Sequence, residues 1–189
     1  MDVDLAELHA RALQSARRPV AAVQANQWGQ PSNCGDWTVR ELVNHMVAGN
    51  SWAAELAAGK TVEEVGTRLD GDVLGNDPLQ AYDDSAAAAV AAFGAPGAMD
   101  APCAVSYGPV PGSEYCGHRL MDVLIHGWDV ARSTGQDATL EPELVEICWA
   151  LIEPHRDLLA GSGMFGSEVT VADDADGQTR LLAALGRGV

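Results

Sequence analysis

Two histidines and an aspartate form the only group in the chain to which a reaction chemistry can be attached. His45 stands in one segment of helical spacing, and Asp122 and His126 stand four residues apart in another. Residues four apart share a helix face, with Cβ atoms about 5–6 Å apart, so this pair can bind one ion from the same side. Three protein ligands leave a coordination position free, as in catalytic zinc sites, whereas structural zinc usually has four. The residues predict a reactive metal centre.

The segment that carries His45 begins with a helix-capping signal. Thr38 and Glu41 have the spacing of a capping box, and the predicted helix runs to about Ala58, before Gly59. His45 shares a face with apolar residues such as Leu42, so we expect it to point inward. Taken alone, such a histidine is more often a structural core residue than a ligand, and the ligand interpretation depends on Asp122 and His126.

The segment from residue 113 to 134 is predicted to be the helix that decides the site. At about 100° per residue its polar side chains form one narrow stripe between wide apolar flanks. The stripe either lines an internal cleft or faces water, and the inward position predicted for His45 favours the cleft. Within it, His118, Arg119 and Asp129 are candidates for contacting substrate or orienting a ligand histidine. Their alternative is plain surface charge.

The remaining helical patterns surround these two segments. Helices are predicted over residues 3–27, 79–93, 141–153 and 179–185, with long connections at 61–77 and 94–112. His9 lies on the apolar face of the first helix, where a core histidine with satisfied hydrogen bonds is a more common occurrence than a ligand. Little of the chain alternates as a strand should, so the fold class is predicted to be all-α.

Length and charge restrict the class of protein. At 189 residues with 47% hydrophobic composition, the chain fits one globular domain over residues 1–189. A net charge of −16 and a pI near 4.4 disfavour nucleic acid as a partner. No segment has the signature of a secretion signal or reaches the roughly 18 apolar residues of a membrane span, so we expect a cytoplasmic protein without a membrane partner.

The cysteines and the common catalytic motifs add no competing site. Cys34, Cys103, Cys116 and Cys148 are widely spaced, with no Cys-x-x-Cys pair, and are expected to be reduced thiols. The sequence has no Walker loop, no Gly-x-Ser-x-Gly elbow and no His-Glu-x-x-His motif. These absences leave His45, Asp122 and His126 as the predicted metal ligands.

Three blocks of this sequence resemble a known family. They are residues 33–45, which contain Trp37-Thr38-Val39 and end in His45, residues 122–135, which contain His126-Gly127-Trp128-Asp129, and residues 173–182. The chain resembles the DinB-like superfamily, in particular its actinobacterial branch related to the metal-binding domain of mycothiol-dependent maleylpyruvate isomerase. The resemblance covers nearly the whole chain and identifies the family better than the activity.

The resemblance implies a fold and a ligand set. It implies a DinB-like four-helix bundle with long connections, here with an additional C-terminal helix and a short tail. A divalent metal would lie between helices, held by a histidine of one and an acid-x-x-x-His pair of another, which map to His45, Asp122 and His126. The isomerase has glutamate as the acidic ligand, and this chain has the shorter Asp122. The isomerase also has a separate C-terminal domain, for which we expect no equivalent here, so maleylpyruvate isomerisation is not the predicted reaction.

Residues and resemblance together predict thiol chemistry. A metal with an open position can bind the sulfur of a low-molecular-weight thiol and lower its pKa for attack on an electrophile. Zinc is the expected ion, and nickel or another first-row ion fits the same ligands. Mycothiol is the expected cosubstrate, in an S-transferase or isomerase-like reaction with a small electrophile. The alternatives are a non-catalytic, metal-stabilised binding or dimerisation module and a member that binds no metal, and the sequence is compatible with a homodimer.

Overall fold

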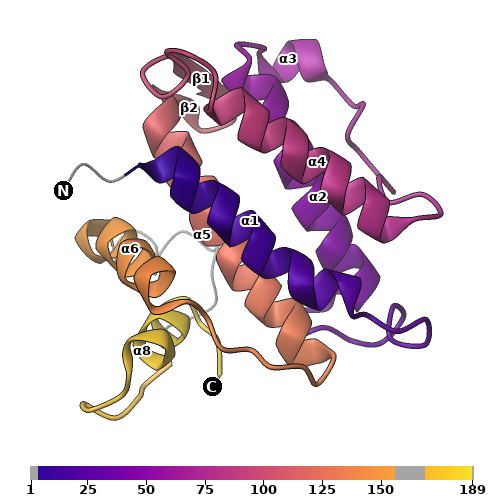
Figure 1. Ribbon diagram of the computed structural model, residues 1–189, viewed down its shortest axis with the longest axis vertical. Helices are drawn as coiled ribbons and strands as arrows, with labels where there is room; N and C mark the ends of the chain where they lie inside the picture. Colours follow the sequence, from indigo (N-terminus) through magenta and orange to yellow (C-terminus); the bar gives the residue numbers. More distant parts are fainter. Residues whose placement is uncertain (1–3, 156–168, 189) are drawn as a thin grey trace. The chain divides into compact units, whose positions relative to one another are not determined.

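A computed structural model describes residues 4–155 and 169–188 (Figure 1). The chain divides into two compact units, Met1–Ala138 and Thr139–Val189, which are described separately. The prediction of a single domain stays a prediction. The first unit contains five helices and two strands among its described residues: α1 Leu5–Ala21, α2 Val39–Ala57, α3 Val62–Val65, α4 Pro78–Phe93, β1 Pro102–Val105, β2 Gly108–Pro111 and α5 Gly112–Ser133.

The first unit is a four-helix bundle. Helix α1 packs against α4 and α5, and α2 packs against the same two helices, so α4 and α5 each contact both of the others (Figure 1). The bundle core is aliphatic and aromatic, and its large fully buried side chains include Leu42, Met46, Tyr82, Phe93 and Leu124. This arrangement confirms the predicted all-α bundle with long connections.

Helix α2 begins where the capping signal predicts. The Thr38 amide donates to Glu41 Oε2 at 2.8 Å, and the Glu41 amide donates to Thr38 Oγ1 at 3.2 Å. The reciprocal bonds satisfy two amides that a helix start leaves without partners. The register of α2, and with it the direction of His45, therefore follows from a local signal.

The first helix is shorter than its periodicity predicted. It ends at Ala21, two residues after Pro19, instead of near residue 27, and its predicted start at Val3 lies outside the described residues. Beyond the helix, the Gln24 amide donates to the side chain of Gln27 at 2.9 Å. A side chain that accepts from the backbone competes with the helical ladder, and the periodicity of apolar residues does not record this competition.

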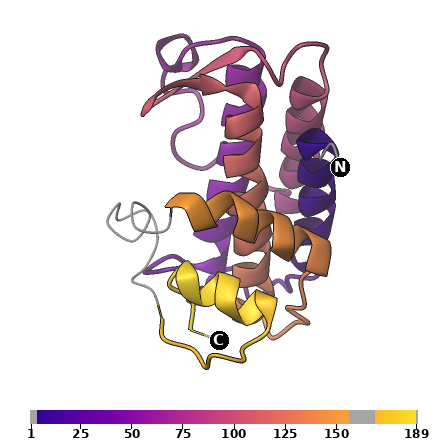
Figure 2. The same cartoon turned by 90° about the vertical axis from the view of Figure 1, so that its left-hand side faces the viewer.

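The connection 94–112 contains a β-hairpin, so its prediction as irregular loop was wrong. Strands β1 and β2 pair antiparallel with Val105 opposite Gly108, and the hairpin lies at the end of the bundle where α5 begins (Figure 2). A two-stranded ribbon has no central strand, so prolines such as Pro109 are tolerated at its edges. The connection 61–77 likewise contains α3, a single turn with its own capping box from Thr61 to Glu64.

The second unit contains α6 Pro142–Ile152, the 3-10 turn η1 Glu153–His155 and α8 Gly177–Ala184 among its described residues. Asp176 caps α8 by accepting from the Thr179 amide at 3.0 Å. The Arg180 guanidinium lies 5.8 Å from the Trp149 ring centroid and joins α8 to α6. Across the described ranges of both units, no helix combines the length and apolar character that a membrane span needs.

Candidate metal centre

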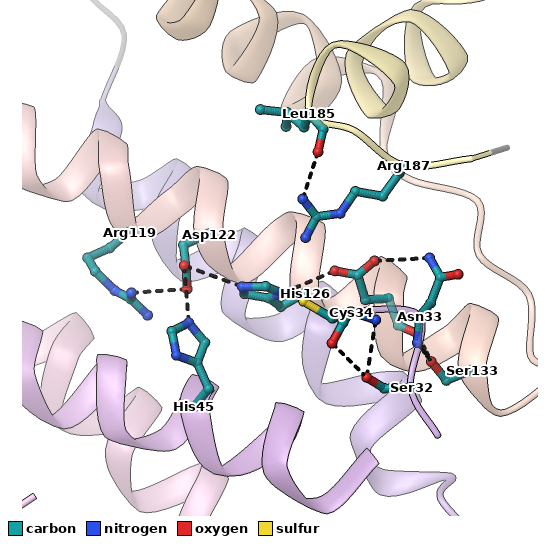
Figure 3. A network of polar contacts seen from close by, with 11 residues as sticks. Ser32, Asn33, Cys34, His45, Arg119, Asp122, His126, Ser133, Leu185 and Arg187 are labelled. Atoms are coloured by element: carbon teal, nitrogen blue, oxygen red, sulfur yellow. Dashed lines mark hydrogen bonds and ion pairs between the residues drawn. The ribbon is translucent and has the colours of Figure 1, made fainter. Parts of the chain in front are cut away.

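The three predicted ligands converge between α2 and α5. His45 Nε2 lies 3.4 Å from Asp122 Oδ1, and His126 Nε2 lies 3.5 Å from the same oxygen (Figure 3). One donor atom from each residue lies within 4.8 Å of the others. The His45 side chain is 37% exposed and that of His126 is 12% exposed, so the group opens to solvent on the His45 side. Two imidazoles and one carboxylate suit zinc and other first-row divalent ions.

Arg119 fixes the other oxygen of Asp122. Its Nη1 lies 3.0 Å from Asp122 Oδ2, an ion pair whose alignment falls short of a hydrogen bond. Oδ1 is thereby the oxygen that faces both histidines (Figure 3). The guanidinium is buried against Gly49, where a Cβ atom would lie 2.5 Å from Nη2. A residue without a side chain at position 49 is therefore part of what places Arg119 and, through it, Asp122.

The charges in this group shift two pKa values in opposite directions. Burial alone would raise the pKa of Asp122, but the charges of Arg119 and the two histidines hold it well below its ordinary value. Burial alone would lower the pKa of His126, but the charge of Asp122 and hydrogen bonds to Asp129 and Cys34 raise it to about 9. Without a metal, Asp122 is thus an anion and His126 a cation near neutral pH.

Asp129 orients His126 from the side opposite the donor group. Its carboxylate is fully buried, and its Oδ2 lies 3.1 Å from His126 Nδ1. A carboxylate behind a ligand histidine fixes the ring and directs the other nitrogen, here Nε2, toward a metal. The interpretation of Asp129 as a surface charge is therefore wrong.

Two further residues approach the donors from the loop before α2, and sequence reasoning gave neither of them a role. The Ser32 amide donates to the Trp37 carbonyl at 2.7 Å and closes the loop. The Trp37 ring centroid lies 5.0 Å from that of His45 and 6.4 Å from that of His126. Cys34 lies beside the His126 ring (Figure 3). Their presence in the family-like block 33–45 was the one signal that could have identified them.

The polar stripe of α5 is divided. Tyr115, Arg119 and Asp129 are buried, which favours the predicted internal cleft over a water-facing stripe. His118 is exposed and its Nδ1 lies 2.7 Å from the Tyr107 hydroxyl of the hairpin, away from the three donors. His9 is in the core as expected, but neither ring nitrogen has a hydrogen-bond partner among the described residues, so the expectation of a satisfied histidine was wrong.

An apolar cavity of about 290 Å³ lies along the same two helices. Trp52 and Leu56 of α2, Tyr115 of α5, and Val105 and Tyr107 of the hairpin contribute to its lining. Trp52 follows His45 by seven residues and Tyr115 precedes Asp122 by seven. At 1.5 Å per residue the cavity is therefore roughly 10 Å from the donors along the bundle.

Comparisons with known proteins agree on one family. The sequence profile described as mycothiol maleylpyruvate isomerase N-terminal domain matches residues 9–131. Two relatives from Mycobacterium tuberculosis, named Uncharacterized protein Rv0738 (strain ATCC 25618 / H37Rv) and Uncharacterized protein MT0763 (strain CDC 1551 / Oshkosh), are each 36% identical over 186 residues, with 96% of both chains covered.

The fold also matches a solved structure. The crystal structure of the mycothiol-dependent maleylpyruvate isomerase superposes with a TM-score of 0.67 at 19% identity, covering 91% of this chain and 78% of that chain. A mutant of the same enzyme gives the same TM-score at 18% identity. The expectation that this chain has no equivalent of the isomerase's C-terminal domain stays a prediction. The profile match and the shared bundle confirm the resemblance, and the chain belongs to the mycothiol maleylpyruvate isomerase N-terminal domain family.

Proposed function

We propose that this protein is a metal-dependent enzyme of low-molecular-weight thiols, with mycothiol as its cosubstrate in an S-transferase or isomerase-like reaction. The observation that carries the proposal is the convergence of His45, Asp122 and His126 on one point that is open on the His45 side. The name of the matching family supports mycothiol as the thiol. A divalent ion held there, zinc by preference, would lower the pKa of a bound thiol and stabilise its thiolate.

The residues around the donors have separate tasks in this proposal. Asp122 supplies the negative charge that a cation needs, and Arg119 keeps its Oδ2 occupied. Asp129 accepts from His126 Nδ1 and so directs Nε2 toward the ion. Trp37 stacks on His45 and shields one side of the site from water. Without a metal, the proton on His126 would have to leave before the ion binds.

The apolar cavity supports an electrophile with an extended apolar group. Its lining is mostly aliphatic and aromatic, and it follows the same α2–α5 groove as the donors. A reacting carbon near the metal and an apolar group in the cavity would require a molecule that spans about 10 Å. The proposed substrates are therefore haloarenes or epoxides that carry such a group.

Metal analysis of protein purified without a metal-affinity tag tests the first half of the proposal. We expect about one divalent ion per chain, lost in His45→Ala and in His126→Ala. The matched control is His118→Ala, which removes a histidine of α5 that lies outside the donor group. Full stoichiometric metal in either ligand variant would show that the assigned residue is not a ligand.

Conjugation assays test the second half. Metal-loaded protein should accelerate reaction of mycothiol with haloarenes or epoxides, chelation should abolish the rate, and glutathione should react poorly because it lacks the sugar contacts. In a series with apolar groups of increasing length, Trp52→Ala should raise KM for the longest member and leave the shortest unchanged. Bound metal without turnover across the panel would favour the alternative, a metal-stabilised binding or dimerisation module.

A further inference from the structure

A second group of metal-ligating side chains lies on the other side of the His126 ring. One donor atom each of Cys34, His126 and Asp129 lies within 4.8 Å of the others. His126 is common to this group and to the group with His45 and Asp122. Its Nε2 faces Asp122 Oδ1, and its Nδ1 faces Asp129 Oδ2 at 3.1 Å. The imidazole therefore stands between two donor groups of different chemistry.

The loop that carries Cys34 is fastened to the end of α5. The Asn33 amide donates to Ser133 Oγ at 2.7 Å, and Asn33 Nδ2 donates to Asp129 Oδ1 at 3.3 Å. The Cys34 amide donates to Ser32 Oγ at 3.1 Å. These bonds hold the thiol beside the ring and occupy Oδ1 of Asp129, which leaves Oδ2 directed at His126. Cys34 is also the one cysteine of the four that is not buried.

We propose that Cys34, His126 and Asp129 form a second, sulfur-containing cation site that takes a thiophilic divalent ion such as Cd²⁺. A thiolate selects soft ions, whereas the His45 group offers only nitrogen and oxygen. Binding releases the thiol proton to solvent as the metal–sulfur bond forms. A neutral imidazole has one nitrogen with a free lone pair, so His126 serves one of the two groups at a time. The nature of the ion thus decides which group is used.

Cadmium titration followed by near-ultraviolet absorption tests this site. Wild-type protein should bind Cd²⁺ with a sulfur-to-cadmium charge-transfer band equivalent to about one thiolate per chain. Cys34→Ser should abolish the band and lower Cd²⁺ affinity on the order of tenfold or more, because it removes a direct ligand. Asp129→Asn should weaken the band's titration in the same direction.

Two variants separate this proposal from the proposed function. His45→Ala disables the nitrogen and oxygen group but should keep the cadmium band at full amplitude. Cys103→Ala removes a buried thiol of the hairpin, outside both groups, and should also keep the band. A band that survives Cys34→Ser, that disappears in His45→Ala, or that never forms on Cd²⁺ binding would overturn the second site. Each of these results leaves the test of zinc and thiol turnover unaffected.

Discussion

The guanidinium of Arg119 lies 3.0 Å from Asp122 Oδ2, one helical turn away on α5. Its Nε and Nη2 are buried without a hydrogen-bond partner in the ranges that the structure describes. A buried cation is costly unless it is paired, so the pairing with Asp122 is the interaction that offsets this cost. The same contact orients the carboxylate toward His45 and His126. Packing in the core and geometry at the candidate metal centre are therefore coupled through two side chains.

Gly49→Ala tests this coupling. The new Cβ would lie 2.5 Å from Arg119 Nη2, so the guanidinium must move away from Asp122. Because the far end of a long side chain gives way, we expect the bundle to fold and the metal affinity to fall about tenfold, as for other outer contacts of metal ligands. Competition with a chromophoric chelator measures the affinity. Gly29→Ala is the control, since nothing lies within 4 Å of its Cβ position, and equal affinities for the two variants would contradict the coupling.

Two substitutions of Asp122 separate charge from reach. Asp122→Asn keeps the shape but removes the negative charge, and we expect metal affinity to fall by about 10–100-fold or more. Asp122→Glu restores the acidic ligand of the isomerase that this chain resembles, and it should retain binding if the cleft accommodates one more methylene. Isothermal titration of both variants checks the two expectations. Undiminished affinity in Asp122→Asn would show that this carboxylate is not a ligand.

Metal affinity should rise with pH up to the region of the raised pKa of His126. The charge of Asp122 and the bond to Asp129 raise that pKa to about 9 against the effect of burial. An ion can bind only after the proton leaves Nε2, so affinity should increase by up to about tenfold per pH unit between pH 6 and 9. Calorimetry in buffers of different ionisation enthalpy should detect close to one released proton. No proton release near pH 7 would mean that His126 is already neutral.

The stability of metal-free protein should be greatest near pH 6.5, because two histidines act in opposite directions. The pKa of His126 is raised to about 9, so its contribution is complete below about pH 6.5 and is lost as pH rises to about 9. Burial and the charge of Arg119 lower the pKa of His9 to about 4, so stability is lost as pH falls from about 6.5 to 4. Urea unfolding across pH 4–9 measures both limbs. His126→Ala should flatten the alkaline limb and His9→Leu the acid limb, and the opposite assignment would refute the argument.

Gly127→Ala should destabilise the bundle without altering the donor residues. An added Cβ would lie 2.7 Å from the Ala16 Cβ and 2.9 Å from its Cα, so α1 and α5 must separate. Overpacking of this kind costs about 1–3 kcal/mol. Thermal unfolding of metal-free protein measures the loss, and Ala16→Gly in the same chain should recover part of it. A variant as stable as wild type would show that the two helices can move apart freely.

Local signals were sufficient for much of the fold and for the donor residues. Helix α2 begins at its capping box, and Asp122 and His126 share a face because α5 has 3.6 residues per turn. The hairpin was missed because its prolines suggest a loop, and a two-stranded ribbon tolerates them at its edges. The apolar period of the first helix continued past Ala21, although the backbone there no longer supported a helix.

The residues around the donors were decided by the tertiary structure alone. Cys34 and His126 are more than ninety positions apart, and Gly49 and Arg119 lie on different helices, so neither contact leaves a periodic trace in the sequence. Residue types and helical period determined which side chains could bind an ion. Only the packing of α2 and the loop before it against α5 decided that Arg119 holds Asp122, that Trp37 stacks on His45, and that a thiol lies beside His126. Such contacts depend on three-dimensional distances between elements, which no local pattern encodes.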